Sequence, residues 1–335
     1  MRTSLVLCAI FVLLFWWFWD YMVPLHEIAH IIGSTWLVLT LSYKLSRLVW
    51  TQVFVTKVSG AGKAVLITGC DTGFGHRLAR RLSRQGFLVF AGCLSCDSDG
   101  AAELKSLPNI KVLELDVTKQ AHVDDALDTV KSHLGCRELW SVVANAGIGT
   151  SALLDSSRHQ KVSAAPQEEQ GRVIAVASPL GRFTLPMIAP YCMSKHALVS
   201  MMDGLRRECY GSGVDFVIVE PSAYRTSIFK ADRTPIDLAM QEFKQQDKEV
   251  TVDYSYQDIE DWMNALVNNL KRFIREDPEE CVDVLERKAR ETYPEVVYRS
   301  PLGRDAPSIA FMTSFPTEII DAFTVVTRKV QLKMN

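Results

Sequence analysis

A tyrosine and a lysine with complementary chemistry stand four positions apart in the chain. Tyr191 and Lys195 fall at the start of a predicted helix over 191–210, so both side chains project from one face of it. A free tyrosine has a pKa of about 10, too high for a base at neutral pH, and a shift of about three units corresponds to about 4 kcal/mol. A neighbouring ammonium favours the phenolate, so the pair could exchange a proton with a substrate. Taken alone, a tyrosine and a lysine at this spacing more often lie on an ordinary exposed helix face. The other motifs therefore decide whether the pair is catalytic.

A glycine-rich turn precedes this pair in the chain. Gly69, Gly73 and Gly75 follow the apolar run 64–68 and open the segment 74–85, which has helical periodicity. Glycines let the backbone approach a pyrophosphate at a helix N-terminus, where free N–H groups and the helix dipole favour an anion. Tight bends use glycine as well, but the position between a strand and a helix favours a dinucleotide site.

The elements that must position these residues alternate between short apolar runs and amphipathic stretches. The alternation is typical of an α/β fold, and it predicts a Rossmann-type doubly wound parallel sheet covered by helices on both faces. Strands are predicted over 64–68, 87–91, 110–115, 139–144, 173–177 and 295–299, and helices over 74–85, 101–107, 121–134 and 191–210.

Four motifs in order resemble the short-chain dehydrogenase/reductase superfamily over residues 62–300. They are the Thr-Gly-x-x-x-Gly-x-Gly run that ends at Gly75, Asn-Ala-Gly at 145–147, Ser178, and Tyr-x-x-x-Lys at 191–195. The stretch 63–94 looks most like the membrane-associated branch, which contains retinol, 17β-hydroxysteroid and 3-hydroxybutyrate dehydrogenases. The resemblance implies an oxidoreductase that transfers a hydride between NAD(H) and a secondary or lipophilic alcohol or ketone.

The resemblance also implies roles for individual residues. Ser178 would hydrogen-bond the substrate oxygen, Tyr191 would exchange its proton, and Lys195 would hold the nicotinamide ribose. Asp116 would accept a hydrogen bond from the adenine amine, and Thr226 would contact the nicotinamide carboxamide. The whole implied cofactor-binding set is Gly69, Asp71, Gly73, Phe74, Gly75, Asp116, Val117, Asn145, Ala146, Gly147, Tyr191, Lys195, Pro221 and Thr226. No metal ligand is implied.

The choice between NAD and NADP depends on the end of the second predicted strand. An arginine there would pair with the additional phosphate of NADP. Residues 92–97 contain no basic residue, and Asp71 and Asp97 would repel that phosphate. The sequence therefore favours NAD over NADP.

The chain departs from the family pattern between Asn145 and Ser178. Only 32 residues separate them, far fewer than the family has, and none of them is asparagine. The helix before the Ser178 strand is therefore expected to be shortened or missing, together with the asparagine that holds a water in the family's proton relay. A true variant and a spliced or wrongly assembled transcript both explain the loss, and we prefer the second. The expected consequences are reduced or absent activity and a weakened homodimer, and the alternative function is a catalytically impaired nucleotide-binding module.

Residues 1–58 predict a hydrophobic membrane anchor. The stretch 5–19 carries no charge, and a second apolar run covers 28–41. A cleaved signal peptide is the competing interpretation, but no small-x-small site follows, and the aromatic residues at 16–21 are typical of an interfacial belt. Basic residues from Lys44 onward favour a cytosolic main domain, held by a hairpin, by a single anchor, or with the second run along the surface. We expect the endoplasmic reticulum membrane, with a mitochondrial membrane as the alternative.

Two metal-like patterns are weak. Residues 26–30 read His-Glu-Ile-Ala-His, the helical zinc pattern of metalloproteases, but no convincing third ligand accompanies them. We interpret this stretch as a polar turn between the two apolar runs. Cys93 and Cys96 form a lone C-x-x-C pair with no second pair to complete a zinc site.

Composition limits the remaining possibilities. The chain has 335 residues, 48% of them hydrophobic and 23% charged, with a net charge of −2. These values argue against a disordered chain and against a nucleic-acid partner bound through a basic surface. The eight cysteines are scattered, unlike those of a secreted disulfide scaffold.

The expected organisation has three parts. Residues 1–58 are the anchor, 62–221 the dinucleotide-binding core with the catalytic residues, and 222–335 a substrate lid with a C-terminal apolar segment. Apolar residues in 228–243 and 262–270 could form a substrate wall, although such stripes are more often core. Together with the anchor they favour a steroid or retinoid over 3-hydroxybutyrate.

Overall fold

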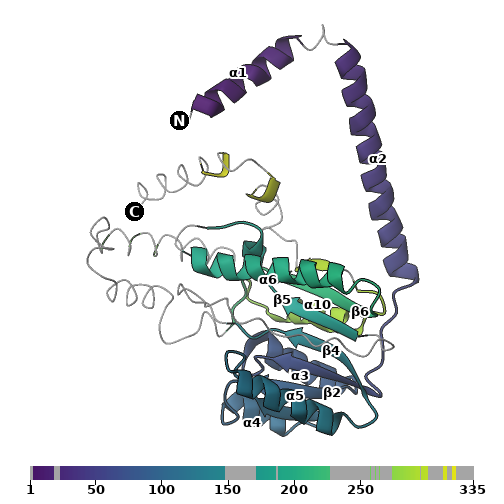
Figure 1. Ribbon diagram of the computed structural model, residues 1–335, viewed down its shortest axis with the longest axis vertical. Coiled ribbons are helices and arrows are strands. Elements are labelled where there is room, and N and C mark those ends of the chain that lie inside the picture. Colours follow the sequence, from purple (N-terminus) through teal and green to yellow (C-terminus); the bar gives the residue numbers. More distant parts are fainter. Residues whose placement is uncertain are drawn as a thin grey trace. The chain divides into compact units, whose positions relative to one another are not determined.

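The computed structural model describes residues 3–18, 23–147, 171–185, 188–226, 274–294 and 296–300, with single positions and short turns at 257, 261, 264, 312–314 and 319–321. The chain divides into two compact units (Figure 1). One comprises Met1–Val55 with Ser314–Asn335, and the other comprises Thr56–Thr313.

The larger unit is built on a parallel sheet of seven strands in the order β3-β2-β1-β4-β5-β6-β7. This confirms the predicted doubly wound fold. The strand order reverses between β1 and β4, and in such sheets the crevice at the carboxyl ends of these strands binds the ligand. The strands are β1 (Lys63–Thr68), β2 (Leu88–Cys93), β3 (Ile110–Glu114), β4 (Glu138–Ala144), β5 (Gly171–Val176), β6 (Val214–Pro221) and β7 (Val297–Ser300).

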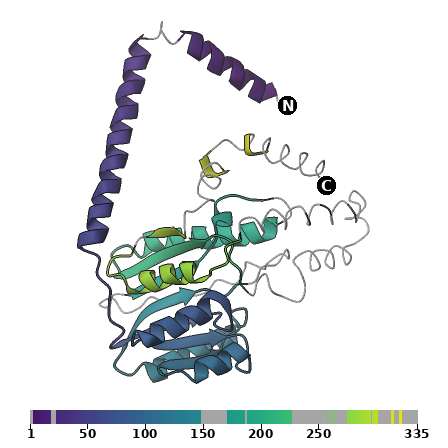
Figure 2. The same ribbon diagram turned by 180° about the vertical axis from the view of Figure 1, so that it is seen from behind.

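Helices cover both faces of the sheet. On one face, α3 (Gly73–Arg84), α4 (Asp99–Lys105) and α10 (Glu279–Arg290) share a single apolar core with the strands. On the other face, α5 (Gln120–Leu134) and α6 (Ala189–Glu208) each have a separate core. Figure 1 shows α6 in front of the sheet, and Figure 2, seen from behind, brings α10 forward.

The helix that we expected to be shortened or missing precedes the Ser178 strand. Residues 148–170, where that loss was predicted, lie outside the described residues. Within the described part of this face, one apolar cluster lies under α5 and a second lies under α6. Leu66 and Val142, which pair across β1 and β4, are only partly buried, and Leu66 packs against the cluster under α5.

Two elements were not predicted from the sequence. In β6, Asp215 and Glu220 interrupt the apolar run, which obscures the strand pattern. Helix α10 lies within the segment that we expected to be a lid, yet its buried residues Val282, Leu285 and Ala289 follow helical spacing and pack against the sheet core. The sheet unit therefore continues beyond residue 221 through α10 and β7.

The smaller unit contains α1 (Thr3–Phe18) and α2 (Val23–Val53). Of the helices that the structure describes, one is long and apolar enough to cross a membrane: within α2, His26–Trp50 has a mean hydropathy of 1.2 and none of it is buried. The His-Glu-Ile-Ala-His stretch lies inside this continuous helix. The expected polar turn at 26–30 is therefore wrong, because the apolar residues on either side propagate a single helix. In the described part of the chain, no three His, Cys, Asp or Glu side chains gather as a metal site.

Candidate active site

The glycine-rich turn between β1 and α3 has a geometry that only glycines allow. Gly69 and Gly73 have φ values of +71° and +66°. A Cβ atom on Gly75 would lie 2.4 Å from the Gly69 carbonyl oxygen and 2.6 Å from Asn145 Nδ2. The backbone therefore forms a tight cradle at the N-terminus of α3. These residues fit the pyrophosphate of a dinucleotide, whose charge such a helix end favours.

Asn145 and Ala146, at the end of β4, tie this turn to the next strand. Asn145 Nδ2 donates to the carbonyl oxygens of Thr68 and Gly69 at 2.9 and 3.1 Å. The backbone N–H groups of Asn145 and Ala146 donate to Thr68 Oγ1 at 3.1 and 2.9 Å. Thr68 was not among the predicted site residues. Its hydroxyl, placed at the last position of a buried strand and directly before the glycines, is the sequence signal that marks it.

The Asp71 carboxylate is directed at the loop that follows β2. It accepts hydrogen bonds from the N–H groups of Leu94 and Ser95 at 2.8 and 3.2 Å and from Ser98 Oγ at 3.3 Å. A Cβ on Gly100 would lie only 1.9 Å from the Asp71 carbonyl oxygen, so the start of α4 packs directly on the turn. Asp71 thus supports the loop and places a negative charge beside it.

Asp116 and Val117 follow β3. Asp116 Oδ1 accepts hydrogen bonds from the Thr118 hydroxyl at 2.7 Å and from the Thr118 N–H at 3.0 Å. These bonds, with Lys119 nearby, hold the pKa of Asp116 below its usual value, so the carboxylate stays ionised and can accept a further hydrogen bond. The Val117 side chain packs into the apolar cluster under α5.

Three other predicted cofactor residues lie around the end of β6. Pro221 is the last residue of that strand, and Thr226 is buried with its side chain beside Gly73. The Phe74 ring packs edge-on against Tyr224, with 5.6 Å between the ring centroids. The loop after β6 therefore contacts the glycine-rich turn, and the Phe74 ring has a packing role there.

Ser178, Tyr191 and Lys195 converge at the carboxyl end of β5. The Ser178 hydroxyl lies near enough to the Tyr191 phenol to lower the pKa of that phenol. Lys195 Nζ lies 5.8 Å from the centroid of the Tyr191 ring and donates to the Val176 carbonyl oxygen at 3.2 Å. A Cβ on Gly147 would lie 3.9 Å from the same nitrogen, so the end of β4 borders the group.

Burial dominates the ionisation of this group. It raises the pKa of Tyr191, while the hydrogen bond from Ser178 lowers it. Burial also lowers the pKa of Lys195 to about 8. Burial therefore moves the pKa of Tyr191 in the direction opposite to the one expected from a neighbouring ammonium, because desolvation outweighs the contribution of Ser178.

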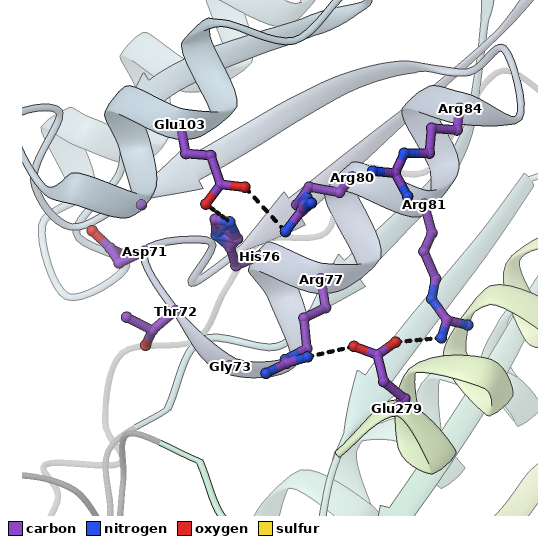
Figure 3. Close-up of a pocket in the computed structure, with 11 residues that line it drawn as sticks. Asp71, Thr72, Gly73, His76, Arg77, Arg80, Arg81, Arg84, Glu103 and Glu279 are labelled. Carbon is purple, nitrogen blue, oxygen red and sulfur yellow. Dashed lines mark hydrogen bonds and ion pairs between the residues drawn. The ribbon is translucent and has the colours of Figure 1, made fainter. Parts of the chain in front are cut away.

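A surface groove of about 460 Å³ runs beside the glycine-rich turn (Figure 3). Glu103 of α4 contacts His76 at 3.2 Å and Arg80 at 3.0 Å, and Glu279 of α10 contacts both Arg77 and Arg81. Carboxylates thus already engage three of the groove's arginines. The groove is an ion-pair network that joins α3 to α4 and α10, and these guanidinium groups are not free for a cofactor phosphate.

Comparison with known proteins agrees with this geometry. The chain matches the short chain dehydrogenase family over residues 63–165 and 157–237. It is 33% identical over 282 residues to retinol dehydrogenase 16 from Mus musculus, an alignment that covers 78% of this chain and 87% of that protein. The chain belongs to the short-chain dehydrogenase family, whose members are NAD(P)-dependent oxidoreductases. The resemblance stated from its motifs is confirmed.

Other relatives share less of their length. The chain is 35% identical over 230 residues to 17-beta-hydroxysteroid dehydrogenase type 6 from Homo sapiens, covering 62% of this chain and 70% of that one. It is 34% identical over 201 residues to mitochondrial D-beta-hydroxybutyrate dehydrogenase from Mus musculus, where the match covers 52% of this chain and spans 59% of that protein's length. A solved short chain dehydrogenase from Burkholderia cenocepacia, in complex with NADP, has the same fold with a TM-score of 0.53 at 19% identity, over 80% of this chain and 99% of that one.

Proposed function

We propose that this protein interconverts a lipophilic secondary alcohol and its carbonyl product, with NAD(H) as cofactor. The observation that carries the proposal is the convergence of Ser178, Tyr191 and Lys195 beside a glycine cradle at the carboxyl edge of the sheet. A proton-transfer group and a dinucleotide cradle at one edge are what alcohol oxidation requires.

Each of the three side chains has a distinct task. Ser178 Oγ accepts a hydrogen bond from the Leu180 N–H at 3.2 Å, which leaves its proton for Tyr191 or for the substrate oxygen. Tyr191 takes the alcohol proton in oxidation and returns it in reduction. The Lys195 ammonium favours the phenolate and holds the nicotinamide ribose. Bound NAD(H) supplies the hydride acceptor or donor.

A steroid or a retinoid is the proposed substrate class. Relatives named for retinol and for 17-beta-hydroxysteroid are matched over more of their length than the relative named for hydroxybutyrate. The apolar helix α2 is consistent with a substrate that partitions into membranes. 3-Hydroxybutyrate is the second candidate, favoured by the identity to the mitochondrial enzyme.

We propose NAD rather than NADP because the loop after β2 is negatively charged where it meets the turn. The Asp71 carboxylate holds that loop, and residues 92–97 contain no lysine or arginine. A phosphate on the adenosine ribose would therefore meet repulsion and no cationic partner from that loop.

The proposed location is the endoplasmic reticulum membrane, with the sheet unit in the cytosol and a mitochondrial membrane as the alternative. Residues 1–58 would be the anchor and 62–221 the nucleotide-binding core. The segment 222–335 would supply the lid and the apolar end, apart from α10 and β7, which belong to the sheet unit. We expect a homodimer weakened by the short segment 148–170.

A catalytically impaired nucleotide-binding module is the second candidate function. It is favoured by the short separation of Asn145 and Ser178 and by the lack of asparagine between them. In that case the cradle would bind NADH while the side chains near Ser178 turned over no substrate.

One experiment separates the two functions. The full-length chain in phospholipid vesicles is assayed with NAD(H) and NADP(H) against retinoid, steroid and 3-hydroxybutyrate substrates, and NADH binding is measured separately by fluorescence. Turnover of a lipophilic alcohol with NAD supports the proposal. NADH binding without turnover of any substrate supports the binding module and overturns the proposed activity.

A further inference from the structure

The turn that follows Ser178 is attached to two neighbouring elements at once. We propose that Arg182 and Glu220 form an ion-paired strut that sets the position of Ser178 against Tyr191, so that Arg182 and Glu220 are positioning residues for the proposed reaction. The inference rests on the proposed function. Neither residue belongs to the motifs that identify the family in this chain.

Glu220 is an unusual residue for its place in the fold. It lies in β6, next to the last residue of that strand, and is 0% exposed to solvent. Arg182 Nε donates to Glu220 Oε1 at 2.7 Å from the loop after β5. A charge buried this completely is held in a fold only with a partner, because desolvation of an unpaired carboxylate is costly.

Arg182 lies only four residues after Ser178 in the chain. The peptide between them is a short 3-10 turn, η2 (Pro179–Gly181), in which the Gly181 N–H donates to the Ser178 carbonyl at 2.9 Å and the Arg182 N–H to the Pro179 carbonyl at 2.9 Å. A turn with this bonding transmits the position of Arg182 to Ser178. The strut therefore fixes the Ser178 end of the turn on β6.

The same turn touches the helix that carries the tyrosine. A Cβ on Gly181 would lie 2.8 Å from the Lys195 carbonyl oxygen and 3.0 Å from a methyl group of Val199. Only glycine allows this approach to α6. The turn is therefore held against α6 on one side and tied to β6 by the Arg182–Glu220 bond on the other. This placement puts the Ser178 hydroxyl near the Tyr191 phenol.

The test separates positioning from stability. Arg182→Met alone removes the guanidinium that pairs with the buried Glu220 carboxylate, and it is expected to lower the Tm. The double variant Arg182→Met/Glu220→Met removes both charges and fills the space with apolar groups of similar volume, which should recover the Tm. We expect kcat of the double variant to stay at least tenfold below that of the full-length wild type, with an unchanged Kd for NADH. A double variant with wild-type Tm and kcat within twofold of wild type would overturn the strut.

Arg81→Met is the matched control. Arg81 forms ion pairs with Glu279, Asp283 and Glu286 between α3 and α10, away from Ser178. The Arg81→Met variant should have a lower Tm and an unchanged kcat. An equal loss of kcat in Arg81→Met and Arg182→Met would overturn the positioning role of Arg182.

If the double variant does not fold, Glu220→Gln and Glu220→Ala test the strut instead. The glutamine keeps an acceptor for Arg182 and should retain at least a third of kcat, whereas the alanine should lose tenfold, and equal kcat values would contradict the strut.

A second readout does not need turnover. In protein labelled with 3-fluorotyrosine, the ¹⁹F resonance of Tyr191 is assigned by its loss in Tyr191→Phe and is titrated with pH. Because the Ser178 hydrogen bond lowers the phenol pKa, Arg182→Met/Glu220→Met should raise it. A wild type that binds NADH but oxidises no substrate would refute the proposed function, and an unchanged Tyr191 titration would refute the strut.

Discussion

At the scale of single residues, burial sets the charge state of the catalytic group. Lys195 has a pKa of about 8 because desolvation disfavours its ammonium, which donates a hydrogen bond to the Val176 carbonyl. The ordinary lysine pKa is about 10.4. The ammonium is therefore fully formed below about pH 7 and is lost as the pH rises through about 8.

This titration makes NADH binding depend on pH. If Lys195 holds the nicotinamide ribose, the Kd for NADH should rise between pH 7 and pH 9. Lys195→Met should weaken binding about tenfold at pH 7, the equivalent of about 1.4 kcal/mol, and should remove the pH dependence. Fluorescence titration of NADH measures both effects. A wild-type Kd that is the same at pH 7 and pH 9 would argue against the role of Lys195.

The titration of Lys195 should affect folding stability in the opposite direction, with stability increasing as the pH rises. The unfolded chain binds the Lys195 proton up to about pH 10.4, whereas the folded chain releases it near pH 8. Within that window the unfolded state holds more protons, so this group makes folding more favourable as the pH rises. Chemical unfolding of the wild type and of Lys195→Met between pH 8 and 10 should show a slope that differs in this direction.

Asp71 gives a prediction about cofactor choice. Asp71→Asn removes the negative charge but keeps an oxygen that can accept the Leu94 N–H bond. The ratio of the Kd for NADPH to that for NADH should fall about fivefold, since one repulsive charge at short range is worth on the order of 1 kcal/mol. Asp124→Asn, on the α5 helix, is the control and should leave the ratio unchanged. A constant ratio in both variants would remove Asp71 from the selectivity argument.

At the scale of elements, the glycine cradle has the least tolerance for change. Gly75→Ala would place a methyl group within 2.6 Å of both the Gly69 carbonyl and the Asn145 amide, so we expect a lower Tm and no measurable NADH binding. Gly204→Ala in α6 is the matched control, because a Cβ there meets no atom within 4 Å. That variant should gain about 0.5–1 kcal/mol of stability. Normal NADH binding by Gly75→Ala would be incompatible with the proposed cradle.

Most strands and helices of the sheet unit could be predicted, because apolar periodicity is a local property of the chain. The predicted strand at 110–115 and helix at 121–134, for example, match β3 and α5 to within one residue. Contacts between residues far apart in the sequence could not be predicted in this way. The support that Asp71 gives to the loop after β2 depends on a contact that sequence spacing does not encode. The same holds for Tyr191, whose pKa is raised by burial more than its neighbours lower it.

At the scale of the whole molecule, the sheet unit has its own core and should fold without the first 55 residues. A chain of residues 56–335 should bind NADH with the Kd of the full chain and remain in the supernatant when mixed with phospholipid vesicles. The full chain should sediment with them because of the apolar helix α2. Sedimentation of both chains would assign membrane binding to another segment.

The most direct measurement is a single turnover in which full-length protein carrying bound NADH is mixed with a ketosteroid or retinal and followed by the loss of NADH absorbance. The wild type should oxidise its NADH. Tyr191→Phe should bind NADH with an unchanged Kd and react on the order of a thousandfold more slowly, because it lacks the proton that the carbonyl oxygen must receive. Equal rates for the two proteins would contradict the proposed role of Tyr191.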